Sequence, residues 1–179
     1  LLGILGTAHA AIITVPQSAL VSSTNSNSVP VTHMYSDAYG NVAVMTGGGN
    51  APGVGIPSGR NDDGFSGPIN LGFTFDFFGT GYTQFWANNN GNISFTNGIS
   101  AYIPNGPTGA TVPVISAFFG DVDTRTSPGV MYVNTSIAHQ IIVTWDQVGF
   151  FNGHASPTNT FQMVVRGADY AVPVGEGTI

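Results

Sequence analysis

The sequence contains no cysteine and no lysine among its 179 residues. Without cysteine, the chain has no disulfide bond, no thiol nucleophile and no cysteine-ligated zinc site. Without lysine, it has neither the phosphate-binding P-loop nor a Schiff-base nucleophile. In an exported chain the absence of cysteine also favours a bacterial source, because extracellular animal modules are often cross-linked by disulfides.

Charged residues are also scarce: they make up 7% of the sequence, and the formal net charge is −6. The only basic side chains are Arg60, Arg125 and Arg166. Proteins that bind nucleic acid need clustered Lys and Arg to displace counterions from the phosphates. We therefore expect no nucleic-acid partner.

Glycine (25 residues), serine, threonine and asparagine are abundant instead. A surface helix needs Ala, Leu, Glu, Lys or Arg along its exposed face, and no window of this sequence supplies them. Strands with hydroxyl and amide side chains on their solvent faces fit this composition. The sequence therefore predicts an all-β fold, a β-sandwich of mostly antiparallel strands with long loops rich in Gly, Asn and Pro.

The first ten residues resemble the end of a signal peptide, with an apolar stretch followed by the small-x-small motif Ala8-His9-Ala10. We expect residues 1–10 to be removed on export, and the mature chain to begin at Ala11. Residues 11–60 are predicted to add short strands and a Gly-rich loop that pack on the main domain, residues 61–179. No other segment approaches the roughly 20 apolar residues of a membrane span, so no transmembrane segment is expected in this sequence.

The clearest strand pattern places Phe73, Phe75 and Phe77 on one parity, with Thr74 and Asp76 on the other. Because successive side chains of a strand point to opposite faces, the three rings are predicted to face the core. Asn90-Gly91 predicts a β-hairpin with a type I′ turn, in which both central residues have positive φ. Further strands are expected at 130–134, 140–148 and 160–166, with a loop over 150–159.

The run from Val112 to Phe119 is apolar and bounded by turn residues, so it predicts a strand buried on both faces. The polar segment that follows it carries Asp121, Asp123 and Arg125. The two carboxylates leave an extended chain on one side and are candidate Ca²⁺ ligands, which Thr124 or the loop around Asp62 and Asp63 could complete. The alternative is structural: the carboxylates accept hydrogen bonds from backbone N–H groups or pair with Arg125.

Aromatic residues provide the candidate binding surface. Phe85, Trp86 and Trp145 are expected in the core, as aromatics at strand spacing commonly are. Phe150, Phe151 and His154 lie in a segment rich in Gly, Asn and Ser, and we predict that they form an exposed surface for a ligand or partner.

Several motifs occur in a fixed order along the chain: Asp62–Gly64, Leu71–Gly79, Trp86–Phe95, Pro113–Arg125, Ile142–Phe151 and Asn159–Val165. Together these motifs, which cover about 115 residues, resemble the nidogen-like (NIDO) domain. The resemblance implies an extracellular, non-enzymatic module of adhesion and matrix proteins. It also implies a closing strand beyond Ile179, and it departs from the animal proteins in lacking their cysteine-rich partner modules.

We therefore predict a secreted or surface-bound, non-catalytic adhesion or matrix-interaction module whose partner is an extracellular protein or glycan. No cofactor is expected, Ca²⁺ apart. One alternative is a secreted carbohydrate-binding module, with or without Ca²⁺, if Asp121, Asp123 and the 150–159 segment form one site. A second alternative is a secreted hydrolase. Three observations weigh against a hydrolase. A zinc enzyme is disfavoured because His33, His139 and His154 show no zinc-ligand spacing, and a glycosidase because the only Glu is Glu176. A serine hydrolase is disfavoured because no Gly-x-Ser-x-Gly motif occurs.

Overall fold

The computed structural model describes residues 39–49, 59–104 and 111–171. All of them belong to one compact unit, residues 34–171. The predicted signal peptide, the expected cleavage before Ala11 and His33 lie outside the described residues. In the described residues every regular element is a strand, which confirms the all-β prediction. No helix in these residues is long and apolar enough to cross a membrane.

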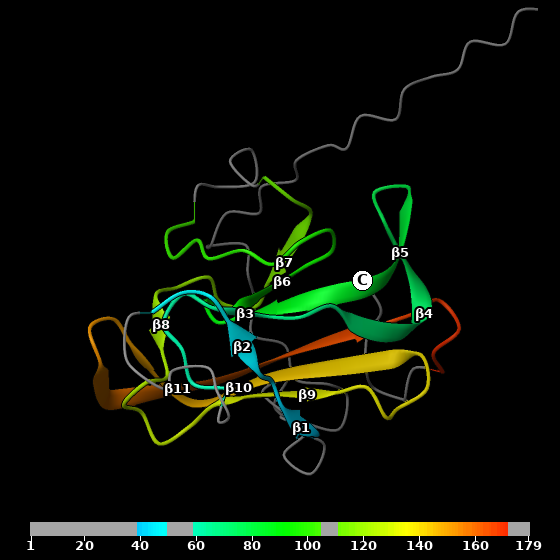
Figure 1. Ribbon diagram of the computed structural model, residues 1–179. Coiled ribbons are helices and arrows are strands. Elements are labelled where there is room, and N and C mark those ends of the chain that lie inside the picture. The colour runs from blue at the N-terminus through cyan, green and yellow to red at the C-terminus, as the bar shows by residue number, and fades with distance from the viewer. Residues whose placement is uncertain (1–38, 50–58, 105–110, 172–179) are drawn as a thin grey trace, which may run out of the picture. The chain divides into compact units, whose positions relative to one another are not determined.

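Two antiparallel sheets form a sandwich-like arrangement (Figure 1). The five-stranded sheet has the order β1-β9-β10-β11, with β8 also paired to β10. Its strands are β1 (Asn41–Val42), β8 (Val122–Asp123), β9 (Met131–Asn134), β10 (Gln140–Phe150) and β11 (His154–Arg166).

The six-stranded sheet has the order β2-β3-β5-β6-β7, with β4 also paired to β5. Its strands are β2 (Met45–Thr46), β3 (Phe65–Ser66), β4 (Ile69–Phe77), β5 (Thr80–Asn88), β6 (Asn92–Ser94) and β7 (Val114–Ser116). The adjacent strands β1 and β2 thus join different sheets, so the segment 41–46 links the two layers.

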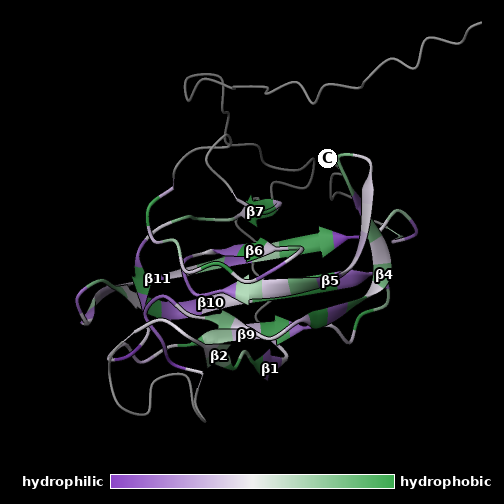
Figure 2. Ribbon diagram, turned by 45° about the horizontal axis from the view of Figure 1, so that its top comes forward, coloured by the Kyte–Doolittle hydropathy of each residue, from purple (hydrophilic) through white to green (hydrophobic). Residues whose placement is uncertain are grey.

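The core lies between the sheets and takes apolar side chains from both. Phe85 of β5 and Trp145 of β10 are its largest fully buried rings, each 0% exposed. Hydrophobic and hydrophilic residues alternate along several strands, as Figure 2 shows. In β4, Phe73, Phe75 and Phe77 are half-buried against this core and the residues between them are exposed, which confirms the predicted alternation.

The strand buried on both faces is β10. Its residues 140–145 are all buried. Ile141, Val143 and Trp145 belong to the core cluster, and Gln140, Ile142 and Thr144 of the opposite face are buried as well. Within the sheet, β9 and β11 flank the strand. The sequence predicted this position for Val112–Phe119, and that prediction is wrong. The run forms only the three-residue edge strand β7, which is half-buried, and Phe118 is 55% exposed. The chain then crosses to the other sheet, where β8 pairs with β10.

Two predicted turns also differ from the structure. The β5–β6 hairpin exists, but Asn88 pairs with Asn92, so its turn has three residues, and of those only Gly91 has positive φ, +81°. The predicted type I′ turn is therefore wrong. The segment 150–159 was expected to be a loop, but only residues 151–153 form one. Phe150 pairs with His154, and β11 begins at His154.

Candidate functional site

Four loops meet at the end of the sandwich where β8 pairs with β10. They are the segment 59–64, the β5–β6 turn, the segment 118–125 and the β10–β11 turn. The β5–β6 turn supports the first and the third of these loops: Asn89 donates its side-chain amide hydrogens to the carbonyl oxygens of Asp62 and Val122. Asn90 accepts a hydrogen bond from the backbone N–H of Val122 at 2.9 Å and donates one to Asp63 Oδ1 at 2.8 Å.

Arg60 connects the segment 59–64 to the segment 124–129. Its guanidinium donates to the carbonyl oxygens of Thr124, Pro128 and Gly129 at 2.9, 3.1 and 2.9 Å, and also to that of Ser127. A single planar donor thus satisfies several backbone acceptors of the segment 124–129, which fixes the turn after β8.

Asp123 plays a structural role here. Its carboxylate forms a bidentate pair with the guanidinium of Arg125 and also accepts backbone N–H bonds from Arg125 (3.0 Å) and Gly153 (2.8 Å). Burial by itself would raise the pKa of Asp123, but these hydrogen bonds outweigh it and lower the pKa below its usual value. Both oxygens are therefore engaged by the protein, as the structural alternative predicted.

Asp121 turns to different neighbours. Asp62, Asp63 and Asp121 each offer a carboxylate oxygen, and these oxygens lie within 4.8 Å of one another. Burial raises the pKa of Asp62 to about 6, helped by Asp123, Asp63 and Asp121 and opposed by Arg125. Burial, and then the charges of Asp63 and Asp123, also raise the pKa of Asp121. The structure thus separates the predicted pair and joins Asp121 to the 62–63 loop.

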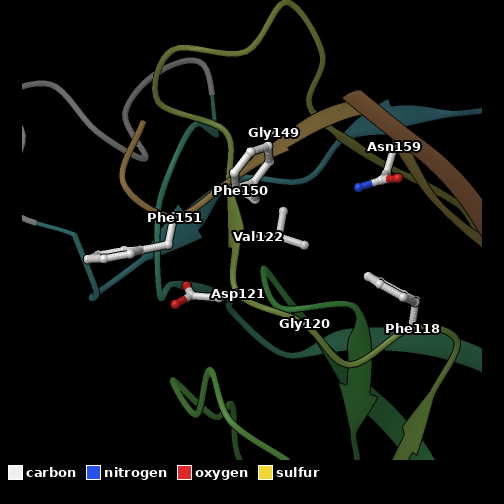
Figure 3. A pocket seen from close by; sticks show the side chains of 8 residues that line it. All are labelled: Phe118, Gly120, Asp121, Val122, Gly149, Phe150, Phe151 and Asn159. Carbon is white, nitrogen blue, oxygen red and sulfur yellow. The ribbon is translucent and has the colours of Figure 1, made fainter. Parts of the chain in front are cut away.

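Beside this cluster lies a depression of about 280 Å³ (Figure 3). Figure 3 shows Asp121 and Phe151 on one side of it and Phe118 and Asn159 on the other. Phe151 is 55% exposed and Phe150 is 37% exposed. The remaining lining residues are Gly120, Val122 and Gly149.

The predicted surface residues Phe150, Phe151 and His154 are brought together by the β10–β11 turn. The ring of His154 stacks on that of Phe150 at 4.7 Å with an angle of 7° between them. His154 Nδ1 lies 2.8 Å from the carbonyl oxygen of Phe151. The other described histidine, His139, lies 6.4 Å from the ring of Phe73. As expected, Phe85 and Trp145 are fully buried, whereas Trp86, also expected in the core, is half-buried.

Sequence reasoning missed the parts played by Asn89, Asn90 and Arg60. The available signal was four asparagines within the five residues 88–92, all of them buried in the structure. Turn asparagines are commonly exposed, so no sequence pattern predicted a buried position for these four residues. Their partners come from loops about 30 residues away along the chain, such as Val122, and only folding brings these together.

The family model described as NIDO related matches residues 31–168. Alpha-tectorin from Gallus gallus, from Mus musculus and from Homo sapiens is similar to this chain, each 30% identical over 129 residues. Each of these alignments covers 58% of this chain but only 6% of the relative. No solved structure matches the chain.

Proposed function

The chain belongs to the NIDO-related family, and from this membership we propose that it is a non-catalytic extracellular module that adheres to a matrix or cell-surface partner. The resemblance of its motifs to nidogen-like domains, which implies modules of adhesion and matrix proteins, supports this function. Because the chain matches only 6% of the length of the alpha-tectorins, the proposal concerns the domain and transfers no activity of a whole relative.

The observation that carries the proposal is the group of exposed rings around the depression. Phe118 and Phe151 are each 55% exposed, and Phe150 is 37% exposed. Rigid aromatic side chains lose little conformational entropy when a partner covers them, and they are enriched where interfaces concentrate their binding energy. Asp121 and Asn159 line the same depression and would give such an interface polar contacts.

The hydrogen-bond partners of Asp123 and His154 also support a non-catalytic role for these two side chains. Asp123 is held by Arg125 and the Gly153 N–H, and His154 stacks on Phe150 beside the Phe151 carbonyl. A general base needs a partner within hydrogen-bond reach from which it takes a proton. Here the partners of Asp123 are donors that keep their protons, because they belong to a guanidinium and to backbone amides.

The proposal is tested by binding of the purified chain to a panel of immobilised matrix proteins and polysaccharides. We expect Phe151→Ser to weaken binding to any positive surface at least about tenfold, since truncating an interface anchor costs more than about 1.4 kcal/mol. Phe78→Ser is the matched control, because Phe78 is 74% exposed in the β4–β5 turn of the other sheet. Equal loss in both variants, or no loss in Phe151→Ser, contradicts this docking surface.

Glycan binding is a second candidate, favoured by the makeup of the same depression. Binding pockets for small molecules combine aromatic surface with a few placed polar groups, and here Phe150 and Phe151 lie beside Asp121 and Asn159. Soluble polysaccharide should then compete for the panel surfaces, and Asn159→Ala should weaken binding. Binding that only protein surfaces support, with no competition by polysaccharide, favours a protein partner instead.

A further inference from the structure

The loops around β8 concentrate negative charge. Asp62, Asp63 and Asp121 offer carboxylate oxygens that lie within 4.8 Å of one another, and Asp123 follows in β8. Arg125 is already paired with Asp123 and reaches Asp62 Oδ2 at 2.8 Å. In the described part of the chain, Arg125 forms salt bridges with Asp123 and Asp62, and no salt bridge involves Asp63 or Asp121.

A second observation concerns buried oxygen atoms without partners. In the described part of the chain, two buried side-chain atoms have no hydrogen-bond partner: Asp62 Oδ1 and Asn89 Oδ1. The Asp62 side chain is 8% exposed and Asn89 is 1% exposed. The two residues are in contact, since the Asn89 amide donates to the Asp62 carbonyl oxygen. A buried acceptor that receives no donor is costly, so the unpartnered Asp62 oxygen favours binding of a cation or of a hydrogen-bond donor.

From these two observations we infer that Asp62, Asp63 and Asp121 form a binding site for a divalent cation of the calcium type. Asp62 Oδ2 is taken by Arg125, so Asp62 Oδ1 is the oxygen that remains for the cation. Asp63 and Asp121 add one carboxylate each, from the same loop and from the segment before β8. This inference does not rest on the proposed adhesion function.

The type of ligand fits calcium. Calcium binds oxygen ligands in a flexible arrangement, whereas Mg²⁺ demands near-ideal octahedral geometry and gives up its water reluctantly. The three carboxylate oxygens lie within 4.8 Å of one another and come from two loops. Calcium also accepts backbone and amide oxygens and water in an irregular shell, which suits a site built from loops.

The local scaffold holds this site in place before a cation binds. Asn90 donates to Asp63 Oδ1 and accepts from the Val122 N–H, so one side chain positions the loop with Asp63 and the strand that follows Asp121. Pre-positioned carboxylates pay less ordering entropy on binding. A bound cation would offset two of the negative charges that otherwise repel one another across these loops.

The test uses the full chain, stripped with EDTA at pH 7.5, and titrates it with CaCl₂ by isothermal calorimetry. We expect one Ca²⁺ per chain and a melting temperature about 5 °C or more higher with saturating Ca²⁺ than with EDTA. Asp63→Asn and Asp121→Asn each keep the side-chain volume and remove one charge, and each should weaken Ca²⁺ binding at least about tenfold. Asp76→Asn, on the exposed face of β4, is the matched control and should bind as the wild type does.

Two variants are used so that a folding defect in one leaves the other informative, and circular dichroism with EDTA checks each fold. Asp62 itself is left unchanged because it also pairs with Arg125. Absence of binding heat together with equal melting temperatures in Ca²⁺ and EDTA overturns the inference. So does unweakened Ca²⁺ binding by both folded variants, or an equal loss in Asp76→Asn. Mg²⁺ that binds as tightly as Ca²⁺ overturns the assignment to calcium.

Discussion

Trp145 Nε1 donates a 3.0 Å hydrogen bond to the backbone carbonyl oxygen of Asn89 and so joins the central strand of one sheet to a hairpin turn of the other. The same Asn89 holds Asp62 and Val122 through its side chain. The buried indole therefore anchors the turn on which the acidic loops rest. The stability of the core and the geometry of the candidate site are coupled through this contact.

Replacing Trp145 with Phe should lower the free energy of unfolding by about 1–3 kcal/mol beyond the change in packing, because the Asn89 carbonyl loses its buried donor. The stack on Phe161, at 4.9 Å, can be kept by the new ring. Urea unfolding measures the loss. Trp86→Phe, at a half-buried position of β5, is the control and should cost less; an equal loss in both variants would show that the hydrogen bond contributes nothing specific.

Gly91→Ala should destabilise the protein more than Gly79→Ala. Both glycines have positive φ, +81° and +80°, so each substitution carries the left-handed backbone cost of about 1–2 kcal/mol. A Cβ at Gly91 would also lie 1.7 Å from the carbonyl oxygen of Phe118, whereas Gly79 has open space around it. Thermal unfolding of the two variants compares them directly. If they melt at the same temperature, the backbone at Gly91 does not lie against the Phe118 carbonyl oxygen.

Asp123→Asn should cost about 3 kcal/mol, since it removes one partner of a buried ion pair and leaves Arg125 without its bidentate carboxylate. Asp123 is 0% exposed, so water cannot reach this position to solvate the donors that lose their carboxylate partner. Asp76→Asn on the exposed face of β4 should change stability by less than about 0.5 kcal/mol. Denaturant titration with EDTA present measures both, and a cost for Asp123→Asn near that of the control would refute its structural role.

Phe75→Ala tests the register of β4. Full burial of a Phe would make this truncation cost about 3–5 kcal/mol, and the half-buried position of Phe75, stacked 5.4 Å from Phe95, reduces the expected cost to about 2–3 kcal/mol. Thr74→Ala on the opposite face should be within about 0.5 kcal/mol of the wild type. A larger effect at Thr74 than at Phe75 would mean that the strand presents its other face to the core.

The amino-acid sequence determined the features that depend on near neighbours. The lack of helix-forming surfaces predicted an all-strand fold, and the alternation of Phe73, Phe75 and Phe77 predicted which face of β4 meets the core. It also identified Phe150 and Phe151 as exposed and offered Arg125 as the structural partner of Asp123. Each of these follows from local composition, from side-chain periodicity or from a spacing of two residues, all of which are properties of neighbouring residues in the chain.

Only the tertiary structure decided the features that depend on distant segments. Apolar character alone did not distinguish β10, which pairs with strands on both sides, from the run at 112–119, which contributes only the edge strand β7. It also did not show that Asp121, and not Asp123, lies with Asp62 and Asp63. These residues come from loops about 60 residues apart, and their geometry is set by how the two sheets pack and by the buried asparagines between them. No local periodicity encodes that packing, because it depends on the neighbours that each strand acquires only when the whole domain folds.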